Sequence, residues 1–263
     1  MLTQQWYFYL GVTDIQYQHI MQTIFLMGYQ LASIILAPVL IAQGLYVRHV
    51  TPRLPEPIGD RSGIEGSGPT IRLLILGDSA AAGVGVSTQG EALSRQLVSA
   101  LSSDFRIYWK LIAKTGYKAS DVLNQIETMP QEDFHVIVMS VGVNDATHGT
   151  RFPKWIYLQN QLIKTLESRF HAQLILISSL PPMHLFPALP QPLKWYLGMR
   201  AKHLNNALQD VAKENDHCEF VSINFPPEKN YMAADGFHPG APAYTAWSNH
   251  LAAIIHERII KGN

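Results

Sequence analysis

Residues 71–83 have the sequence IRLLILGDSAAAG. The first six, Ile71–Leu76, are apolar except for Arg72 and predict a buried strand. Gly77, Asp78 and Ser79 follow directly, which predicts a loop at the carboxyl end of that strand. An amphipathic stretch over Glu91–Leu101 predicts the next helix. A buried strand followed by a loop and a helix indicates an α/β fold.

The same succession of strand and helix continues to the end of the chain. Short apolar runs predict strands over Phe105–Ala113, His135–Val141, Gln173–Ser178 and Cys218–Ile223. Longer amphipathic stretches predict helices over Ser120–Glu127, Pro153–Phe170, Leu193–Lys213 and Ala241–Ile260. Strands that alternate with helices form right-handed crossovers and a parallel sheet covered on both faces. We therefore predict an α/β domain over residues 70–263.

The composition excludes several classes of protein. The 263 residues carry 20 Lys and Arg against 20 Asp and Glu, so the chain has no net positive charge for a nucleic-acid partner. Hydrophobic residues make up 47%, which excludes a disordered chain. Cys218 is the only cysteine, so neither a disulfide nor a multi-cysteine zinc site can form.

Residues 1–50 differ from the rest because they contain only two charges, Asp14 and Arg48. Ile24–Val47 is mostly apolar, and as one helix of 24 residues it would be about 36 Å long, enough to cross a bilayer. Pro38 would kink this helix. A cleavable signal peptide fits poorly, because no Lys or Arg precedes the apolar run. We predict a hydrophobic helix that anchors the chain in a membrane as a single pass; a buried or interfacial helix is the alternative.

The flanks of this segment suggest its orientation and its end. Arg48, Arg53 and Arg61 follow the apolar run, so the positive-inside rule places the C-terminal domain on the cytoplasmic side. A periplasmic or otherwise external domain is the alternative. Residues 51–69 contain four prolines and four glycines, which predicts a linker between anchor and domain.

Polar residues follow the predicted strands at one edge of the sheet, where ligands bind in such folds. Ser79 follows the first strand, Gly116 the second and Asn144 the third, while Asp235 and His238 lie after the fifth and just before the last helix. Four loops thus bring a hydroxyl, a backbone donor, a carboxamide and an Asp/His pair together.

These groups are what acyl transfer requires. A serine hydroxyl needs a neighbouring imidazole to take its proton, and the imidazole needs a carboxylate to hold its tautomer. We expect Ser79 to attack, His238 to act as base and then acid, and Asp235 to orient the ring. The backbone N–H groups of Ser79 and Gly116 and the side chain of Asn144 would form the oxyanion hole. Gly116 suits that role because its N–H can approach the reacting carbonyl closely.

With these residues the sequence resembles the SGNH hydrolases, also called the GDSL esterase/lipase family. The four blocks match Ser79 in GDSAAAG, Gly116 in KTGYKASD, Asn144 in GVND and His238 in DGFHPG. The resemblance covers roughly residues 70–260. It implies a flavodoxin-like three-layer α/β/α fold and hydrolysis of carboxylic esters or thioesters without a metal or other cofactor. The chain has GDSA where the family name implies GDSL, at a variable position; residues 1–69 lie outside the family pattern.

Other readings of the same residues are weaker. An α/β-hydrolase would need a G-x-S-x-G elbow, and a nucleotide-binding module would need a complete Gly-rich phosphate motif; GDSAAAGVG has neither. A non-catalytic, membrane-tethered binding domain is a further alternative. Asp78, Gly83 and Asp145 are expected to have structural roles. His148 lies near the same edge, but ten other histidines give no reason to select it. The histidines show no HExxH or other metal-ligand spacing.

Residues 180–199, LPPMHLFPALPQPLKWYLGM, bear on the substrate, a small-molecule ester. They contain five prolines, many large apolar side chains and a single charge, Lys194. This segment could form a lid or acyl-binding wall beside the site, or a rigid connector packed on the core. Together with a membrane partner at residues 24–47, it favours lipid-like esters with short to medium acyl chains. The alternative within the same fold is a carbohydrate O-acetylesterase.

Overall fold

A computed structural model describes residues 14–223 and 229–261. The chain folds as two units, which divide between His49 and Val50. The second unit contains a six-stranded sheet with the strand order β1-β3-β2-β4-β5-β6. The strands are β1 (Ser62–Glu65), β2 (Thr70–Gly77), β3 (Arg106–Ala113), β4 (Val136–Ser140), β5 (Leu174–Ser178) and β6 (Cys218–Val221). All neighbouring strands are parallel except β1, which runs antiparallel to β3.

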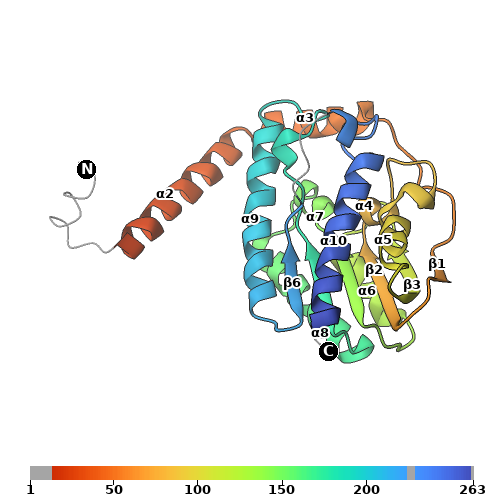
Figure 1. The fold of residues 1–263 in the computed structure, drawn as a ribbon. Helices are drawn as coiled ribbons and strands as arrows, with labels where there is room; N and C mark the ends of the chain where they lie inside the picture. Colours follow the sequence, from red (N-terminus) through yellow and green to blue (C-terminus); the bar gives the residue numbers. More distant parts are fainter. Residues whose placement is uncertain (1–13, 224–228, 262–263) are drawn as a thin grey trace, which may run out of the picture. The chain divides into compact units, whose positions relative to one another are not determined.

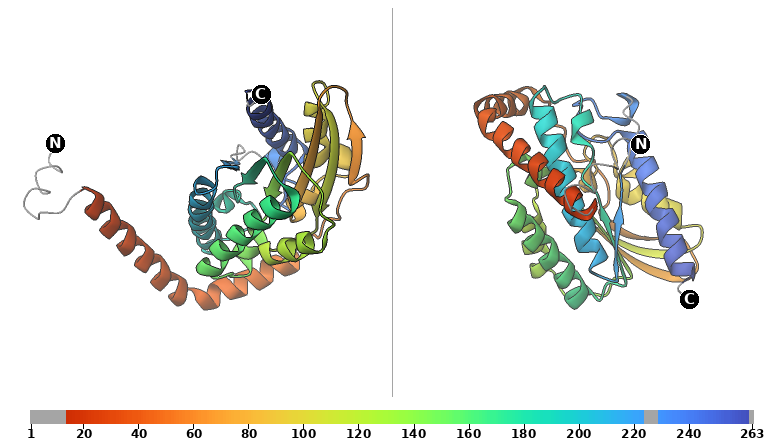
Figure 2. Two further views of the ribbon diagram at one scale, coloured as in Figure 1. Left: turned by 90° about the horizontal axis from the view of Figure 1, so that it is seen from below. Right: turned by 90° about the vertical axis from the view of Figure 1, so that its left-hand side faces the viewer.

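Helices cover both faces of this sheet (Figures 1 and 2), which makes a three-layer α/β/α arrangement. One face carries α5 (Leu93–Leu101) and α10 (Ala241–Lys261), and the other carries α6 (Ala119–Thr128), α8 (Phe152–Phe170) and α9 (Leu193–Lys213). Two short helices, α4 (Ser79–Ala82) and α7 (Val143–Thr147), lie directly after strands β2 and β4. The 3₁₀ turns are η1 (Gln89–Glu91), η2 (Met183–Leu185) and η3 (Lys229–Tyr231).

The central strand β2 explains why residues 71–76 are so apolar. Leu73 and Ile75 belong to the core cluster that includes α5 and α10 side chains, and Leu74 and Leu76 alternate with them along the strand. All four side chains are fully buried. A strand that is covered on both faces cannot tolerate polar residues, so its sequence is a continuous apolar run. The predicted α/β fold with a central sheet is confirmed.

The sheet differs from the prediction at one edge. Residues 62–65, inside the segment predicted as a linker, form β1 and pair with residues 107–110 of β3. The four residues are mostly exposed, so they carry no apolar alternation by which a strand could be recognised. The sheet is therefore mixed rather than wholly parallel, and part of the region 51–69 belongs to it.

The N-terminal unit also differs from the prediction of one hydrophobic helix over Ile24–Val47, which is not confirmed. Two helices occupy this region, α2 (Asp14–Ile35) and α3 (Ala37–Val50). Their segments Met27–Ile35 and Ala37–Val50 are bent by 69°. Pro38 explains the break, because it has no N–H to donate and its ring clashes with the carbonyl four residues earlier. Within the described ranges no one helix has the length and apolar character for a membrane span, and only this bent pair meets both criteria jointly.

Candidate active site

The Ser79 turn (residues 77–83) runs from the last residue of β2 through α4 to Gly83 and is almost entirely buried. The Asp78 carboxylate accepts a hydrogen bond from the Ala80 N–H at 3.1 Å and so caps α4, and Gly83 ends it in the left-handed conformation. The Asp78 N–H donates to the Ser140 carbonyl at 3.1 Å, which ties the turn to the end of β4. These contacts hold Ser79 at the carboxyl edge of the sheet.

Ser79, His238 and Asp235 form one hydrogen-bonded relay. His238 Nε2 lies 2.9 Å from Ser79 Oγ, and His238 Nδ1 lies 2.6 Å from Asp235 Oδ2. An ionised carboxylate can only accept, so Nδ1 carries the proton and Nε2 is left to accept from the serine hydroxyl. The structure thus brings together the three residues that the sequence places 159 and 3 positions apart.

The Asp235 carboxylate is held in its ionised form. Burial alone would raise its pKa, but hydrogen bonds from the His238 side chain and from the His238 and Phe237 N–H groups outweigh burial and lower the pKa. Both N–H groups donate to Oδ1 at 3.0 Å, which leaves Oδ2 for the imidazole. The carboxylate is therefore fixed in place by the backbone of the same loop that carries His238.

Gly116 and Asn144 lie on two further segments at the same edge. Gly116 lies in the Gly116 loop (residues 114–118) between β3 and α6, with φ +88°. Asn144, in the first turn of α7, donates its side-chain N–H to the Tyr117 carbonyl at 3.0 Å. The carboxamide thus lies against the loop that carries Gly116.

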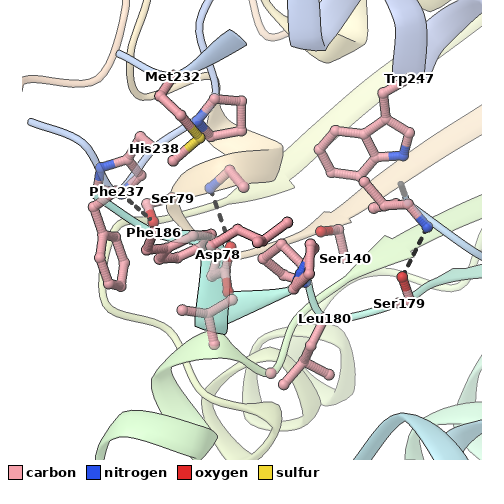
Figure 3. Close-up of a pocket in the computed structure, with 18 of the residues that line it drawn as sticks. Asp78, Ser79, Ser140, Ser179, Leu180, Phe186, Met232, Phe237, His238 and Trp247 are labelled. Atoms are coloured by element: carbon pink, nitrogen blue, oxygen red, sulfur yellow. Dashed lines mark hydrogen bonds between the residues drawn. The ribbon is translucent and has the colours of Figure 1, made fainter. Parts of the chain in front are cut away.

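An apolar pocket opens beside Ser79 (Figure 3). Ser79 and His238 lie at one end and Trp247 at the other. Residues 180–182 and 185–187 form one wall, and further apolar side chains close the pocket: Val141, Ile223, Met232, Phe237 and Pro239. The first part of the segment 180–199 therefore lines a pocket at the serine, whereas Leu193 and the residues after it belong to α9.

Comparison with known proteins adds a family to this geometry. A sequence model of the GDSL-like lipase/acylhydrolase family matches residues 75–246, more than half of the chain. The chain belongs to this family. It is accordingly a carboxylic ester hydrolase. A search of curated protein sequences found no match to this GDSL hydrolase.

Solved structures share the fold of this GDSL hydrolase at low sequence identity. A psychrotrophic esterase, EstA, from Pseudoalteromonas sp. is 17% identical with a TM-score of 0.56, over 71% of this chain and 97% of that chain. A carbohydrate acetylesterase family member from Sinorhizobium meliloti is 22% identical with a TM-score of 0.51, over 71% and 98%. A carbohydrate esterase family 2 enzyme from Corynascus thermopiles (Myceliophthora fergusii) is 13% identical with a TM-score of 0.55, over 78% and 68%. These likenesses show the fold.

Asp78 is buried beside the relay of this GDSL hydrolase and has an unusual pKa. Burial raises the pKa to about 6, although the Ala80 N–H, the nearby His238 and the Gly142 N–H each favour the charged form. Asp145 is also buried; its carboxylate accepts from the Ala119 N–H and from Thr150 Oγ1, both at 2.9 Å. Both aspartates thus hold backbone segments together, in keeping with the structural roles expected from the sequence.

The remaining candidates lie apart from the relay. His148 is exposed at the end of α7, where Nδ1 lies 2.8 Å from the Asn144 carbonyl. Burial, and then the charge of Glu167, raise the pKa of Cys218 to about 12, so its reactive thiolate form is disfavoured. In the part of the chain that the structure describes, no group of His, Cys, Asp and Glu side chains could hold a metal ion.

The sequence did not identify every residue that lines the pocket. Trp247 lies on α10, Met232 directly follows η3, and Ile223 lies two residues after the end of β6. Phe237 could have been anticipated, because it stands between Asp235 and His238. Trp247 carries no such signal, since a tryptophan on an amphipathic helix is ordinarily a core residue.

Proposed function

We propose that this GDSL hydrolase is a serine esterase that cleaves carboxylic esters or thioesters through an acyl-enzyme. The observation that carries the proposal is the relay from Ser79 Oγ through His238 to Asp235, with hydrogen bonds of 2.9 and 2.6 Å. A hydroxyl, a correctly protonated imidazole and an ionised carboxylate in this order are the parts of a nucleophilic triad. Ser79 and His238 line one end of the apolar pocket, and Asp235 is hydrogen-bonded to His238 Nδ1.

In the first half of the reaction, Ser79 Oγ bonds to the ester carbonyl carbon while His238 Nε2 takes the hydroxyl proton. The carbonyl π electrons move onto its oxygen. When the tetrahedral intermediate collapses, the bond to the alcohol oxygen breaks and the leaving alcohol takes the proton from Nε2. Water then repeats the sequence on the acyl-enzyme and releases the acid and free Ser79. Asp235 keeps the proton on Nδ1 throughout and stabilises the imidazolium.

The oxyanion is assigned to three donors: the N–H groups of Ser79 and Gly116 and the side chain of Asn144. Ser79 is the first residue of α4, where N–H groups have no partner within the helix. Asn144→Ala should lower kcat by about 100–1,000-fold with little change in KM, because the donor acts mainly in the transition state. An unchanged kcat would remove Asn144 from the oxyanion hole.

Covalent labelling tests the nucleophile. A serine-reactive fluorophosphonate should label the wild-type protein once, and Ser79→Ala should abolish the label and lower turnover by at least about a thousandfold. Ser99→Ala, at an exposed serine on α5, is the matched control and should label normally. Labelling at another residue would overturn the assignment. An unlabelled, inactive wild type would instead support a non-catalytic binding domain.

For the substrate, we propose lipid-like esters with a short to medium acyl chain, because the pocket wall beside Ser79 is apolar. Turnover of p-nitrophenyl esters should rise from acetate to medium acyl lengths. Leu180→Asp, in the pocket wall, should reduce this preference. Phe152→Asp, at an exposed apolar residue of α8 that does not line the pocket, is the control and should leave it unchanged. Activity confined to acetate would overturn this substrate class and favour a carbohydrate O-acetylesterase.

We further propose that the N-terminal helices associate with a lipid membrane and that the hydrolase domain lies on the cytoplasmic side. Large apolar side chains of α2 and α3 are exposed, including Ile34 at 72% and Ile41 at 64%. Arg48 and Arg53 support the orientation, but Arg61 does not, because it is paired with Glu56 inside the domain.

Fractionation tests the membrane association. Full-length protein should pellet with membranes, and the double variant Ile34→Lys/Ile41→Lys should stay in the supernatant. Tyr157→Lys, at an exposed aromatic residue on α8, is the control and should still pellet. Protease added to intact cells should leave the hydrolase domain uncut. A wild type that stays in the supernatant would overturn the association, and cleavage in intact cells would overturn the orientation.

A further inference from the structure

The first three residues of the Gly116 loop are not held in place by packing. Lys114, Thr115 and Gly116 are all exposed, and a side-chain carbon added at Gly116 would meet no atom within 4 Å. An exposed loop would ordinarily sample several conformations, and fixing each of its residues costs conformational entropy. Something other than side-chain packing must therefore fix the direction of the Gly116 N–H.

Hydrogen bonds hold the loop from two sides. On the inner side, Asn144 donates to the Tyr117 carbonyl at 3.0 Å. On the outer side, Glu56 Oε1 accepts from the Thr115 N–H at 2.7 Å and from the Thr115 hydroxyl at 2.8 Å. Thr115 directly precedes Gly116, so Glu56 fixes one end of the peptide unit that carries the Gly116 N–H.

Arg61 holds the Glu56 carboxylate in position. Its guanidinium lies 2.9 Å from Glu56 Oε2 and also donates to the Ala113 carbonyl. The Arg61 carbonyl accepts from the Leu111 N–H at 2.7 Å. Burial would raise the pKa of Glu56, but the hydrogen bonds from Thr115 and Arg61 outweigh burial and lower the pKa, so the carboxylate stays charged. Through these hydrogen bonds, Glu56 and Arg61 hold the end of β3 and the Gly116 loop in place.

The backbone around Glu56 is itself attached to the other side of the site. The Ile58 N–H donates to the Ser87 carbonyl at 3.3 Å, and the Ile58 carbonyl accepts from the Gln89 N–H at 2.8 Å. Pro57 packs so closely against Gly83 that a Cβ there would lie 2.9 Å from the proline ring. The segment that carries Glu56 therefore connects the Ser79 turn to the Gly116 loop.

We propose that Glu56 is a positioning residue for ester hydrolysis: its carboxylate holds Thr115 so that the neighbouring Gly116 N–H stays aimed at the developing oxyanion. This inference rests on the oxyanion role proposed above for Gly116. Glu56 lies before residues 75–246, which match the family. A misplacement of about 1 Å in a catalytic group can cost about 100-fold, and complete loss of an oxyanion donor costs about 100–1,000-fold.

Kinetics of Glu56 variants in the full-length protein test the inference. Glu56→Ala should lower kcat by about 10–100-fold and leave KM within about twofold, because only the transition state carries the oxyanion. Glu56→Gln keeps an oxygen that can accept from Thr115, so it should recover most of the loss. Thr115→Val removes one of the two hydrogen bonds at nearly constant shape and should lower kcat by a smaller factor.

Glu65→Ala is the matched control. Glu65 lies in the same N-terminal segment, pairs with Arg95 and has a side-chain exposure of 32%, against 29% for Glu56. Its variant should retain the wild-type kcat. Equal kcat values for Glu56→Ala and Glu65→Ala would overturn the positioning role of Glu56. If fluorophosphonate still labels Ser79 in that case, the proposed triad is unaffected. If Glu56→Ala fails to fold, an unchanged kcat in Thr115→Val has the same meaning. A wild type without label at Ser79 would instead overturn the proposed function itself.

Discussion

The Ser79 turn and the Gly116 loop lie at the same edge of the sheet but are held in opposite ways. The Ser79 turn is buried and packed: a Cβ at Gly77 would lie 2.0 Å from the Ser140 carbonyl oxygen and 2.7 Å from Ala81. The Gly116 loop is exposed, and a Cβ at Gly116 would meet nothing within 4 Å. The first is fixed by close packing in addition to the hydrogen bonds of Asp78, whereas the exposed part of the second is held by hydrogen bonds from distant residues. Substitutions in the two should therefore separate stability from activity.

The largest effect is expected for Gly77→Ala. The added methyl group would push the end of β2 away from β4 and break the hydrogen bond from the Asp78 N–H to the Ser140 carbonyl. We expect the free energy of unfolding to fall by about 4 kcal/mol or more, or no folded protein at all. Denaturant unfolding measures this. Gly90→Ala, whose Cβ would meet its nearest atom at 3.5 Å, is the control and should unfold like the wild type. Equal stability of the two variants would contradict the packed description of the Ser79 turn.

Asp78→Asn should show an effect that depends on pH. The folded-state pKa of Asp78, about 6, lies above its ordinary value of 3.8, so the folded protein binds a proton over this range that the unfolded chain has lost. The wild type therefore becomes less stable as the pH rises from about 4 to about 6, by up to about 3 kcal/mol. Asn cannot ionise, so the variant should gain stability relative to the wild type over that range and keep the gain at higher pH.

Unfolding curves at pH 4 and pH 7.5 measure this difference. Gln209→Ala, at an exposed residue of α9, is the control, and its difference from the wild type should not change with pH because neither side chain ionises. A stability difference for Asp78→Asn that is the same at both pH values would show that folding does not raise the pKa of Asp78.

The smallest change in stability is expected for Gly116→Ala. No neighbour clashes with the methyl group, and the only cost is the left-handed conformation at φ +88°, about 1–2 kcal/mol for a residue other than glycine. The melting temperature should fall by a few degrees, while kcat should fall by at least about tenfold because the strained peptide turns its N–H away from the oxyanion. The fall in kcat could also come from unfolded variant protein. If kcat falls only in proportion to the fraction of Gly116→Ala that is folded, the conformation of this loop does not matter for catalysis.

The sequence predicts well what depends on local patterns. The predicted strands and helices of residues 70–263 overlap with β2–β6 and with α5, α6, α8, α9 and α10, because buried parallel strands need unbroken apolar runs and the helices need an apolar stripe. Ser79, Asp235 and His238 were predicted to meet, since each follows a strand or precedes the last helix at the carboxyl edge. Their hydrogen bonds agree with this expectation.

Features that depend on long-range contacts could not be predicted. β1 is exposed and gains its order from pairing with β3. Arg61 was counted as a flanking charge of a membrane segment, yet it pairs with Glu56 and bonds to the end of β3. No periodicity reveals a glutamate whose partner lies 59 residues away. The break before Pro38 was anticipated as a kink, but not as a bend of 69° between two separate helices.

The two outer strands of the sheet also limit how molecules of this protein can associate. β1 and β6 have only four residues each, so either edge offers about 13 Å of backbone to a neighbouring chain. Each edge also carries a paired charge, Glu65 with Arg95 and Glu219 with Arg258. Short, charged edges are poor templates for further strands. The sheet is thereby protected against growing from one molecule into the next, even where many copies are crowded together.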